Sequence, residues 1–193
     1  QHDYFIRESC AQYIFKKNSL TRVVSNSKAE HPLLDLLRSK EHPGLILFTT
    51  GTTGRPKAIL HDFIPFISRY KTPRPPLKAV SFLLFDHIGG INTLLHMLFN
   101  LGQIVSIQER TVESVANIIK NFSVELLPTT PTFLRMLSLY PGIENLLGSS
   151  LKIISYGTER MDQPTLNELC ELLPDVDFRQ TFGLSELGIV RVK

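Results

Sequence analysis

Short apolar runs alternate with helical patterns along most of this chain, and that alternation limits the fold more than any other feature. Strand-like runs are predicted at residues 45–49, 58–60, 79–84, 103–107, 124–127, 152–156 and 177–180. Helical spacing is predicted between them at residues 62–70, 90–100, 112–121, 132–140 and 164–173. Helical crossovers connect parallel strands, so the sequence predicts an α/β fold with a mostly parallel sheet flanked by helices.

The first 44 residues have a different pattern. Residues 4–17 and 32–40 carry apolar side chains near helical spacing, and we expect them to cover one face of the sheet. The predicted organisation is therefore a helical lead-in over residues 1–44, followed by an α/β core over residues 45–193.

Composition and charge exclude several classes of protein. The chain has 193 residues, 42% of them hydrophobic, which is enough to bury one substantial core. Its net charge of +3 gives no overall positive field that would attract nucleic acid or an anionic membrane. No apolar run approaches the ~20 residues that cross a bilayer. Cys10 and Cys170 are isolated, as in reduced intracellular proteins, so we expect a soluble cytoplasmic protein.

A threonine-rich segment after the strand at residues 45–49 has the composition of an anion-binding loop. Glycines let the main chain approach a phosphate, hydroxyls donate hydrogen bonds, and an ammonium group adds charge. The residues that we predict to bind phosphate are Thr49, Thr50, Gly51, Thr52, Thr53, Gly54 and Lys57. The spacing does not fit a Walker loop, and the segment is expected to join two strands. The alternative is an ordinary glycine-rich turn.

Three further stretches follow predicted strands, where the loops of a parallel sheet converge. Gly157, Thr158 and Glu159 follow the strand at 152–156, although Asp162 and Pro164 also fit a simple helix start. The second stretch follows the strand at 177–180. Its ring, hydroxyls and carboxylate could bind a nucleotide and Mg²⁺. The alternative is a turn with a helix cap. It contains Thr181, Phe182, Gly183, Ser185 and Glu186.

The third stretch follows the strand at 79–84 and contains Asp86 and His87 before two glycines. A single histidine in this position is often structural. Residues 69–78 are basic and rich in proline, which predicts a stiff solvated linker. An anion site or a strip that binds a partner is the alternative for that linker.

The order Thr-Gly-Thr-Thr-Gly-x-Pro-Lys resembles the phosphate loop of the adenylate-forming (AMP-binding) superfamily, which includes acyl- and aryl-CoA ligases, adenylation domains of peptide synthetases and luciferases. Residues 157–159 resemble its Gly-Gly-Glu stretch, and residues 182–186 resemble its Tyr-Gly-x-Thr-Glu motif. The resemblance covers residues 45–188 with the motifs in the family's order. It implies that the chain is part of the large amino-terminal domain of such an enzyme.

The resemblance also implies a role for each matching residue. Residues 157–159 would contribute main chain to the adenine pocket, Phe182 would stack on adenine, and Ser185 would contact the α-phosphate. Glu186 would coordinate Mg²⁺, and Lys57 would neutralise developing charge. His87 would lie beside the carboxylate to be activated, whereas Asp86 would bind the substrate amine in an amino-acid-activating relative.

The implied reaction is ATP-dependent activation of a small-molecule carboxylate as an acyl-adenylate, followed by transfer to CoA or a carrier thiol. The family usually continues with a ribose-binding aspartate and a small carboxy-terminal domain with a catalytic lysine, and neither follows Lys193. We therefore expect a central piece of a larger ligase with little or no turnover by itself. The alternatives are a non-catalytic nucleotide-binding module and part of an amino-acid adenylation domain.

Overall fold

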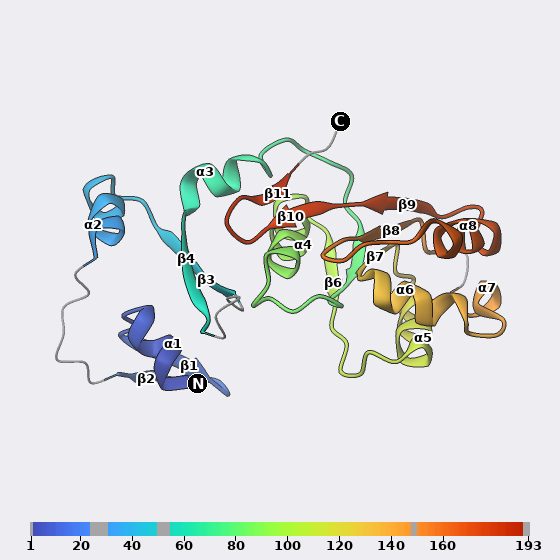
Figure 1. The fold of residues 1–193 in the computed structure, drawn as a ribbon, viewed down its shortest axis with the longest axis horizontal. Coiled ribbons are helices and arrows are strands. Elements are labelled where there is room, and N and C mark those ends of the chain that lie inside the picture. Colours follow the sequence, from blue (N-terminus) through green and yellow to red (C-terminus); the bar gives the residue numbers. More distant parts are fainter. Residues whose placement is uncertain (1, 24–30, 50–54, 148–149, 191–193) are drawn as a thin grey trace. The chain divides into compact units, whose positions relative to one another are not determined.

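The computed structural model describes residues 2–23, 31–49, 55–147 and 150–190, in two compact units that divide between residues 68 and 69 (Figure 1). Each unit is described by itself. The division proposed from the sequence at residue 45 stays a prediction.

The second unit is built on one parallel sheet with the order β6-β5-β7-β8-β9. Its strands are β5 (Lys78–Val80), β6 (Gln103–Val105), β7 (Leu126–Thr129), β8 (Ile153–Tyr156) and β9 (Asp177–Gln180). The helices between them are α4 (Ile88–Phe99), α5 (Val112–Phe122), α6 (Pro131–Ser138), α7 (Ile143–Leu146) and α8 (Gln163–Leu172). The predicted α/β class and the mostly parallel sheet are therefore confirmed.

Helices pack on both faces of this sheet. The main core lies between the sheet and α5, α6, α7 and α8, where side chains such as Val115, Leu134 and Leu169 are fully buried. A smaller core, made by Ala79, Met97 and Leu126, joins α4 to the other face. Figure 1 shows α4 on the opposite side of the sheet from α5 and α6. The inner strands β5, β7 and β8 are largely buried from both sides, which explains their apolar sequences, whereas the edge strand β9 is mostly exposed.

Helix starts in this unit follow local capping chemistry. The Thr130 hydroxyl accepts a hydrogen bond from the Phe133 N–H at 3.3 Å, with Pro131 as the first residue of α6. The Asp162 carboxylate accepts from the Thr165 N–H at 3.0 Å and caps α8. These signals can be read from the sequence, so the predicted positions of α6 and α8 agree closely with the structure.

The first unit contains an antiparallel pair of strands, β3 (Gly44–Thr49) and β4 (Lys57–Asp62). The threonine-rich segment joins these strands, as predicted, and Thr49 pairs with Lys57 at the point where the segment begins and ends. The other elements of this unit are α1 (His2–Glu8), β1 (Tyr13–Lys16), β2 (Ser19–Arg22), α2 (Pro32–Ser39) and α3 (Phe63–Ser68).

Two local expectations were wrong. The helix expected over residues 4–17 ends at Glu8, and β1 and β2 then form a hairpin. Lys17 and Asn18 have φ values of 47° and 62°, as in the two-residue type I′ turn, and this turn overrides the apolar spacing. In addition, residues 182–190 form the hairpin of β10 (Phe182–Leu184) and β11 (Gly188–Val190), so Ser185 does not cap a helix.

Among the described residues, none of the helices is both long and apolar enough to cross a membrane. Cys10 and Cys170 are free thiols, as expected.

Candidate functional site

The order of the strands places the candidate site at the carboxyl edge of the parallel sheet. β5 lies between β6 and β7, so the connection after β5 runs to one side and the connection after β6 returns to the other. Ligands of open α/β sheets bind where the strand order reverses in this way, because the loops on the two sides diverge and leave a crevice. The stretches predicted to be functional in this unit all follow strands of the sheet.

Residues from three of these stretches line one small cavity with a volume of about 50 Å³. One stretch follows β5, one follows β8 and one follows β9. Their residues at the cavity are Gly89, Gly157, Thr158, Thr181 and Gly183. The structure thus brings these three stretches together, and the roles of their residues in binding stay predictions.

Close contact between two main-chain segments forms one side of this cavity. The Thr181 N–H donates to the Tyr156 carbonyl at 2.7 Å, and the Thr181 hydroxyl donates to the same oxygen at 3.0 Å. A Cβ atom added at Gly157 would lie 2.4 Å from the Thr181 carbonyl oxygen. Glycine is therefore required at position 157 by packing, independently of any ligand.

A buried hydroxyl at this cavity has no partner. Thr129 ends β7 and is 1% exposed, and its Oγ1 makes no hydrogen bond to any described residue. Thr129 also lines the small cavity. A buried hydroxyl without a partner costs free energy, so this atom suits a hydrogen bond to a bound polar group. No pattern in a single sequence distinguishes Thr129 from other strand residues.

Thr158 has an unusual main-chain conformation, with a φ of +72°. This left-handed region is unfavourable for a β-branched residue. The sequence comparison with the family's Gly-Gly-Glu stretch placed a glycine at this position. The structure explains that difference physically, because glycine adopts this conformation without steric cost.

Thr158→Gly is expected to raise the free energy of unfolding by about 1 kcal/mol, because relief of the strain exceeds the entropy that glycine adds to the unfolded chain. Thr158→Ala removes the hydroxyl and the methyl group but keeps the Cβ atom in the left-handed region, so it should give a smaller gain. Urea denaturation of the three proteins measures both effects. A loss of stability in Thr158→Gly would mean that the threonine side chain makes contacts worth more than the strain.

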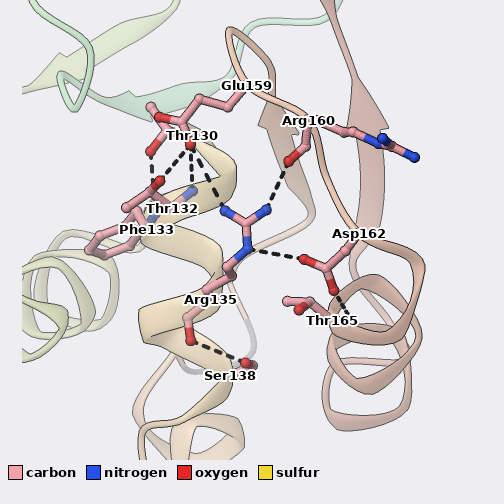
Figure 2. Close-up of polar contacts among 9 residues, drawn as sticks. All are labelled: Thr130, Thr132, Phe133, Arg135, Ser138, Glu159, Arg160, Asp162 and Thr165. Carbon is pink, nitrogen blue, oxygen red and sulfur yellow. Dashed lines mark hydrogen bonds and ion pairs between the residues drawn. The ribbon is translucent and has the colours of Figure 1, made fainter.

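The Glu159 side chain has a structural role at the start of α6. Figure 2 shows its carboxylate directed at Thr132, whose N–H and hydroxyl donate to it at 3.2 and 2.5 Å. Arg135 lies 4.0 Å from the same carboxylate, donates from Nε to Asp162 at 3.0 Å, and donates to the Arg160 carbonyl at 2.8 Å. These contacts tie the loop after β8 to α6. The predicted contribution of Glu159 to an adenine pocket would therefore come from its main chain.

Asp162 supports the same loop. Hydrogen bonds from Thr165, followed by the hydrogen bond from the Arg135 guanidinium, hold the pKa of Asp162 well below its usual range. Asp162 is therefore ionised at neutral pH, and its negative charge lies at the amino end of α8, where the helix dipole favours it.

The remaining predicted residues of the second unit lie on exposed or half-buried positions. Phe182 begins β10 with 55% of its surface exposed. Ser185 and Glu186 lie on the turn between β10 and β11, and Glu186 is exposed. His87 precedes α4 as its N-cap residue, and its side chain makes no capping hydrogen bond.

The predicted phosphate segment is described only at its ends. Thr50, Gly51, Thr52, Thr53 and Gly54 lie outside the described residues. At the end of the segment, the Tyr4 hydroxyl donates to the Pro56 carbonyl at 2.8 Å, while the Phe5 and Phe48 rings pack with centroids 4.6 Å apart. Lys57 is exposed at the start of β4. The role of this segment in phosphate binding stays a prediction.

A larger cavity of about 230 Å³ adjoins the small one. The two share Asn92, Thr93, Ser155 and Thr181 as lining residues. The larger cavity extends along the face of the sheet that carries α4. Among the residues that line it, only Thr181 was predicted as a site residue, and the basic linker also contributes to it.

Comparison with known proteins identifies the family of this chain. The sequence profile of a family described as AMP-binding enzyme matches residues 6–192. A curated relative, 4-coumarate--CoA ligase-like 6 of Arabidopsis thaliana, is 27% identical over 154 residues, which is 73% of this chain and 27% of the relative. Another, the fatty acid--[acyl-carrier-protein] ligase ScoC of Streptomyces coeruleorubidus, is 26% identical over 153 residues, which is 74% of this chain and 29% of the relative.

Solved structures have the same fold. The luciferase-like enzyme of the nonluminescent mealworm Zophobas morio has a TM-score of 0.66 and 22% identity, over 75% of this chain and 35% of that one. The anthranilate CoA ligase AuaEII, solved with anthranoyl-AMP, has a TM-score of 0.66 and 17% identity, over 73% of this chain and 29% of that one. The chain thus spans between a quarter and two fifths of the length of these relatives. The profile match over residues 6–192 shows that the chain belongs to the AMP-binding enzyme family of adenylate-forming ligases.

Proposed function

We propose that this chain forms the nucleotide- and acid-binding core of an ATP-dependent ligase that activates a small carboxylate as its acyl-adenylate. The activated acyl group would then pass to the thiol of CoA or of a carrier. One observation carries the proposal: residues that follow β5, β8 and β9 converge on a single cavity at the edge where the strand order reverses.

The cavities suit the two reactants of such an enzyme. The small cavity combines main chain at Gly157 and Gly183 with the unpartnered Thr129 hydroxyl, so a flat polar group can approach closely and form hydrogen bonds. The larger cavity shares Thr93 and Ser155 with it. An acid bound in the larger cavity would therefore point its carboxylate at the nucleotide.

In the proposed first step, a carboxylate oxygen bonds to the α-phosphorus of ATP, and the bond from that phosphorus to pyrophosphate breaks. In the second step, a thiol sulfur bonds to the acyl carbon and AMP leaves. Both reactants of the first step are anions, so the protein must hold them together and offset their charge. We assign this task to Lys57, to the hydroxyls of residues 49–53 and to the Ser185 hydroxyl.

The other predicted residues have supporting roles. The exposed Phe182 ring is assigned to adenine, and the exposed His87 at the start of α4 is assigned to the carboxylate of the acid. Glu186 is assigned to Mg²⁺, which supplies a positive charge to the phosphates when it is bound.

Calorimetric titration of the chain with Mg-ATP tests the proposal. Lys57→Ala and Glu186→Ala are expected to weaken binding by about tenfold or more each, because each removes one charge-assisted contact. Lys120→Ala and Glu171→Ala are matched controls, since Lys120 on α5 and Glu171 on α8 are exposed charges outside the site. These two variants should bind as the unchanged chain does. Equal affinity in all five proteins would contradict the assigned site.

A further inference from the structure

The larger cavity carries an excess of positive charge. Arg69, Arg74 and Arg179 line it together with the titratable His96, and none of the described residues that line it is an aspartate or a glutamate. A cavity with cations and without carboxylates favours a negatively charged ligand, since low-dielectric walls strengthen the field inside it.

The basic linker at this cavity is hydrogen-bonded to α4 and to the residue that follows this helix. The buried Tyr70 hydroxyl donates to Asn92 at 2.8 Å, and the Arg74 N–H donates to the Asn100 side chain at 2.6 Å. The Asn100 amide in turn donates to the His96 carbonyl at 2.8 Å. Residues 71–76 are exposed, as the solvated-linker interpretation predicts. These two hydrogen bonds nevertheless hold the main chain at Arg74 in place. The linker therefore forms an ordered wall of the cavity.

The arginines at the cavity differ in their pairing. Arg179 donates to Asp177 at 2.7 Å, which offsets its charge. The Arg74 side chain forms no ion pair with any described residue. Burial lowers the pKa of His96, and the positive charge of Arg74 lowers it further. His96 is therefore neutral at pH 7 and becomes easier to protonate when an anion binds beside it.

Part of the lining is apolar. Besides the hydroxyl-bearing Tyr70 and Thr72, the cavity is lined by Leu77, Leu126 and Ile153. An aliphatic or aromatic spacer fits against these side chains, with polar groups at its two ends.

We propose that the larger cavity binds the distal end of the acid substrate and that this end carries a second anionic group, so that the preferred acids are dicarboxylates. The inference rests on the proposed function. The first carboxylate lies toward Thr181 and Ser155, where the two cavities meet, and the second lies among the arginines.

Adipate and hexanoate test the inference, because they have the same six-carbon chain and differ in one carboxylate. In calorimetric titrations at low salt, adipate is expected to bind the chain about tenfold more tightly than hexanoate does. One charge-assisted contact accounts for a difference of this size. Arg74→Gln should bring the ratio of adipate to hexanoate affinity down to about one. Lys71→Gln is the matched control, since Lys71 is exposed on the same linker and does not line the cavity. It should keep the preference.

A second readout follows His96 by NMR. Adipate is expected to raise the pKa of His96 in the unchanged chain and in Lys71→Gln, but not in Arg74→Gln. Hexanoate should leave the pKa of His96 unchanged. Equal affinities for the two acids, or equal losses in Lys71→Gln and Arg74→Gln, would overturn the inference. Displacement of adipate by coenzyme A in an Arg74-dependent manner would also overturn it, because the cations would then belong to the thiol donor.

The two proposals fail separately. Mg-ATP binding without a preference for adipate overturns the dicarboxylate inference and leaves the ligase core intact. An Arg74-dependent preference for adipate without any Mg-ATP binding supports the anion site and overturns the ligase assignment.

Discussion

Gly90→Ala is expected to lower the free energy of unfolding by about 3 kcal/mol or more, as overpacking against rigid atoms does. A Cβ atom at this position would lie 1.9 Å from the Leu84 carbonyl oxygen and 2.5 Å from the Leu84 carbonyl carbon. Both atoms belong to the main chain that enters the first turn of α4, so neither can turn away as a side chain would. The helix would have to move off the sheet.

Gly89→Ala is the matched control, one residue earlier in the same helix. There the added Cβ atom would lie 3.0 Å from Leu83 Cδ1, the end of a flexible side chain. Alanine also favours the helical state by about 1 kcal/mol over glycine, so this variant should be neutral or slightly stabilised. Urea unfolding of both variants measures the difference in their free energies of unfolding. The slope of this free energy against urea concentration should stay unchanged. Similar losses in the two would mean that the close approach at Gly90 relaxes.

This difference bears on how the stretch after β5 is interpreted. The resemblance to CoA ligases placed His87, which precedes the two glycines, beside the carboxylate of the substrate. In the structure, Gly90 is explained by its packing against Leu84, whereas Gly89 lines the small cavity. Only the first of the two glycines is therefore placed to contact a ligand.

Much of the second unit could be predicted from sequence because its signals are local. Thr130 with Pro131, and Asp162 with Pro164, mark helix starts, and the apolar runs mark strands buried on both faces. The hairpin at residues 13–22 was missed because its signal is Lys17-Asn18 alone, a weaker form of the usual Asn-Gly turn.

The site was predictable only in part, and for a related reason. Glycines and hydroxyls after strands are visible in the sequence, so the three converging stretches could be named. Arg74 and Arg179 face one cavity because Asn100 fixes the linker and because β9 lies at the edge of the sheet. Such tertiary contacts join residues about a hundred positions apart and leave no trace in a single sequence.

Gly157→Ala is expected to lower the free energy of unfolding by about 2 to 4 kcal/mol. The added Cβ atom would lie 2.4 Å from the Thr181 carbonyl oxygen and 2.6 Å from its Oγ1. Both hydrogen bonds from Thr181 to Tyr156 join β8 to β9 at this point, so separating the two segments would weaken them together. Because the same segments line the small cavity, Mg-ATP binding should weaken by about tenfold or more as well.

Gly142→Ala separates this clash from the conformational freedom of glycine. Gly142 has a φ of +73°, and an added Cβ atom would meet nothing within 4 Å, whereas Gly157 has the clash without a positive φ. The Gly142 variant should therefore lose only about 1 kcal/mol, from the left-handed conformation, and should bind Mg-ATP normally. Suppose that both variants lose the same free energy of unfolding and bind Mg-ATP with the same affinity. The contact between Gly157 and Thr181 would then not determine the shape of the cavity. A large loss of stability and of Mg-ATP affinity in Gly157→Ala alone would show that this contact supports both the fold and the shape of the small cavity.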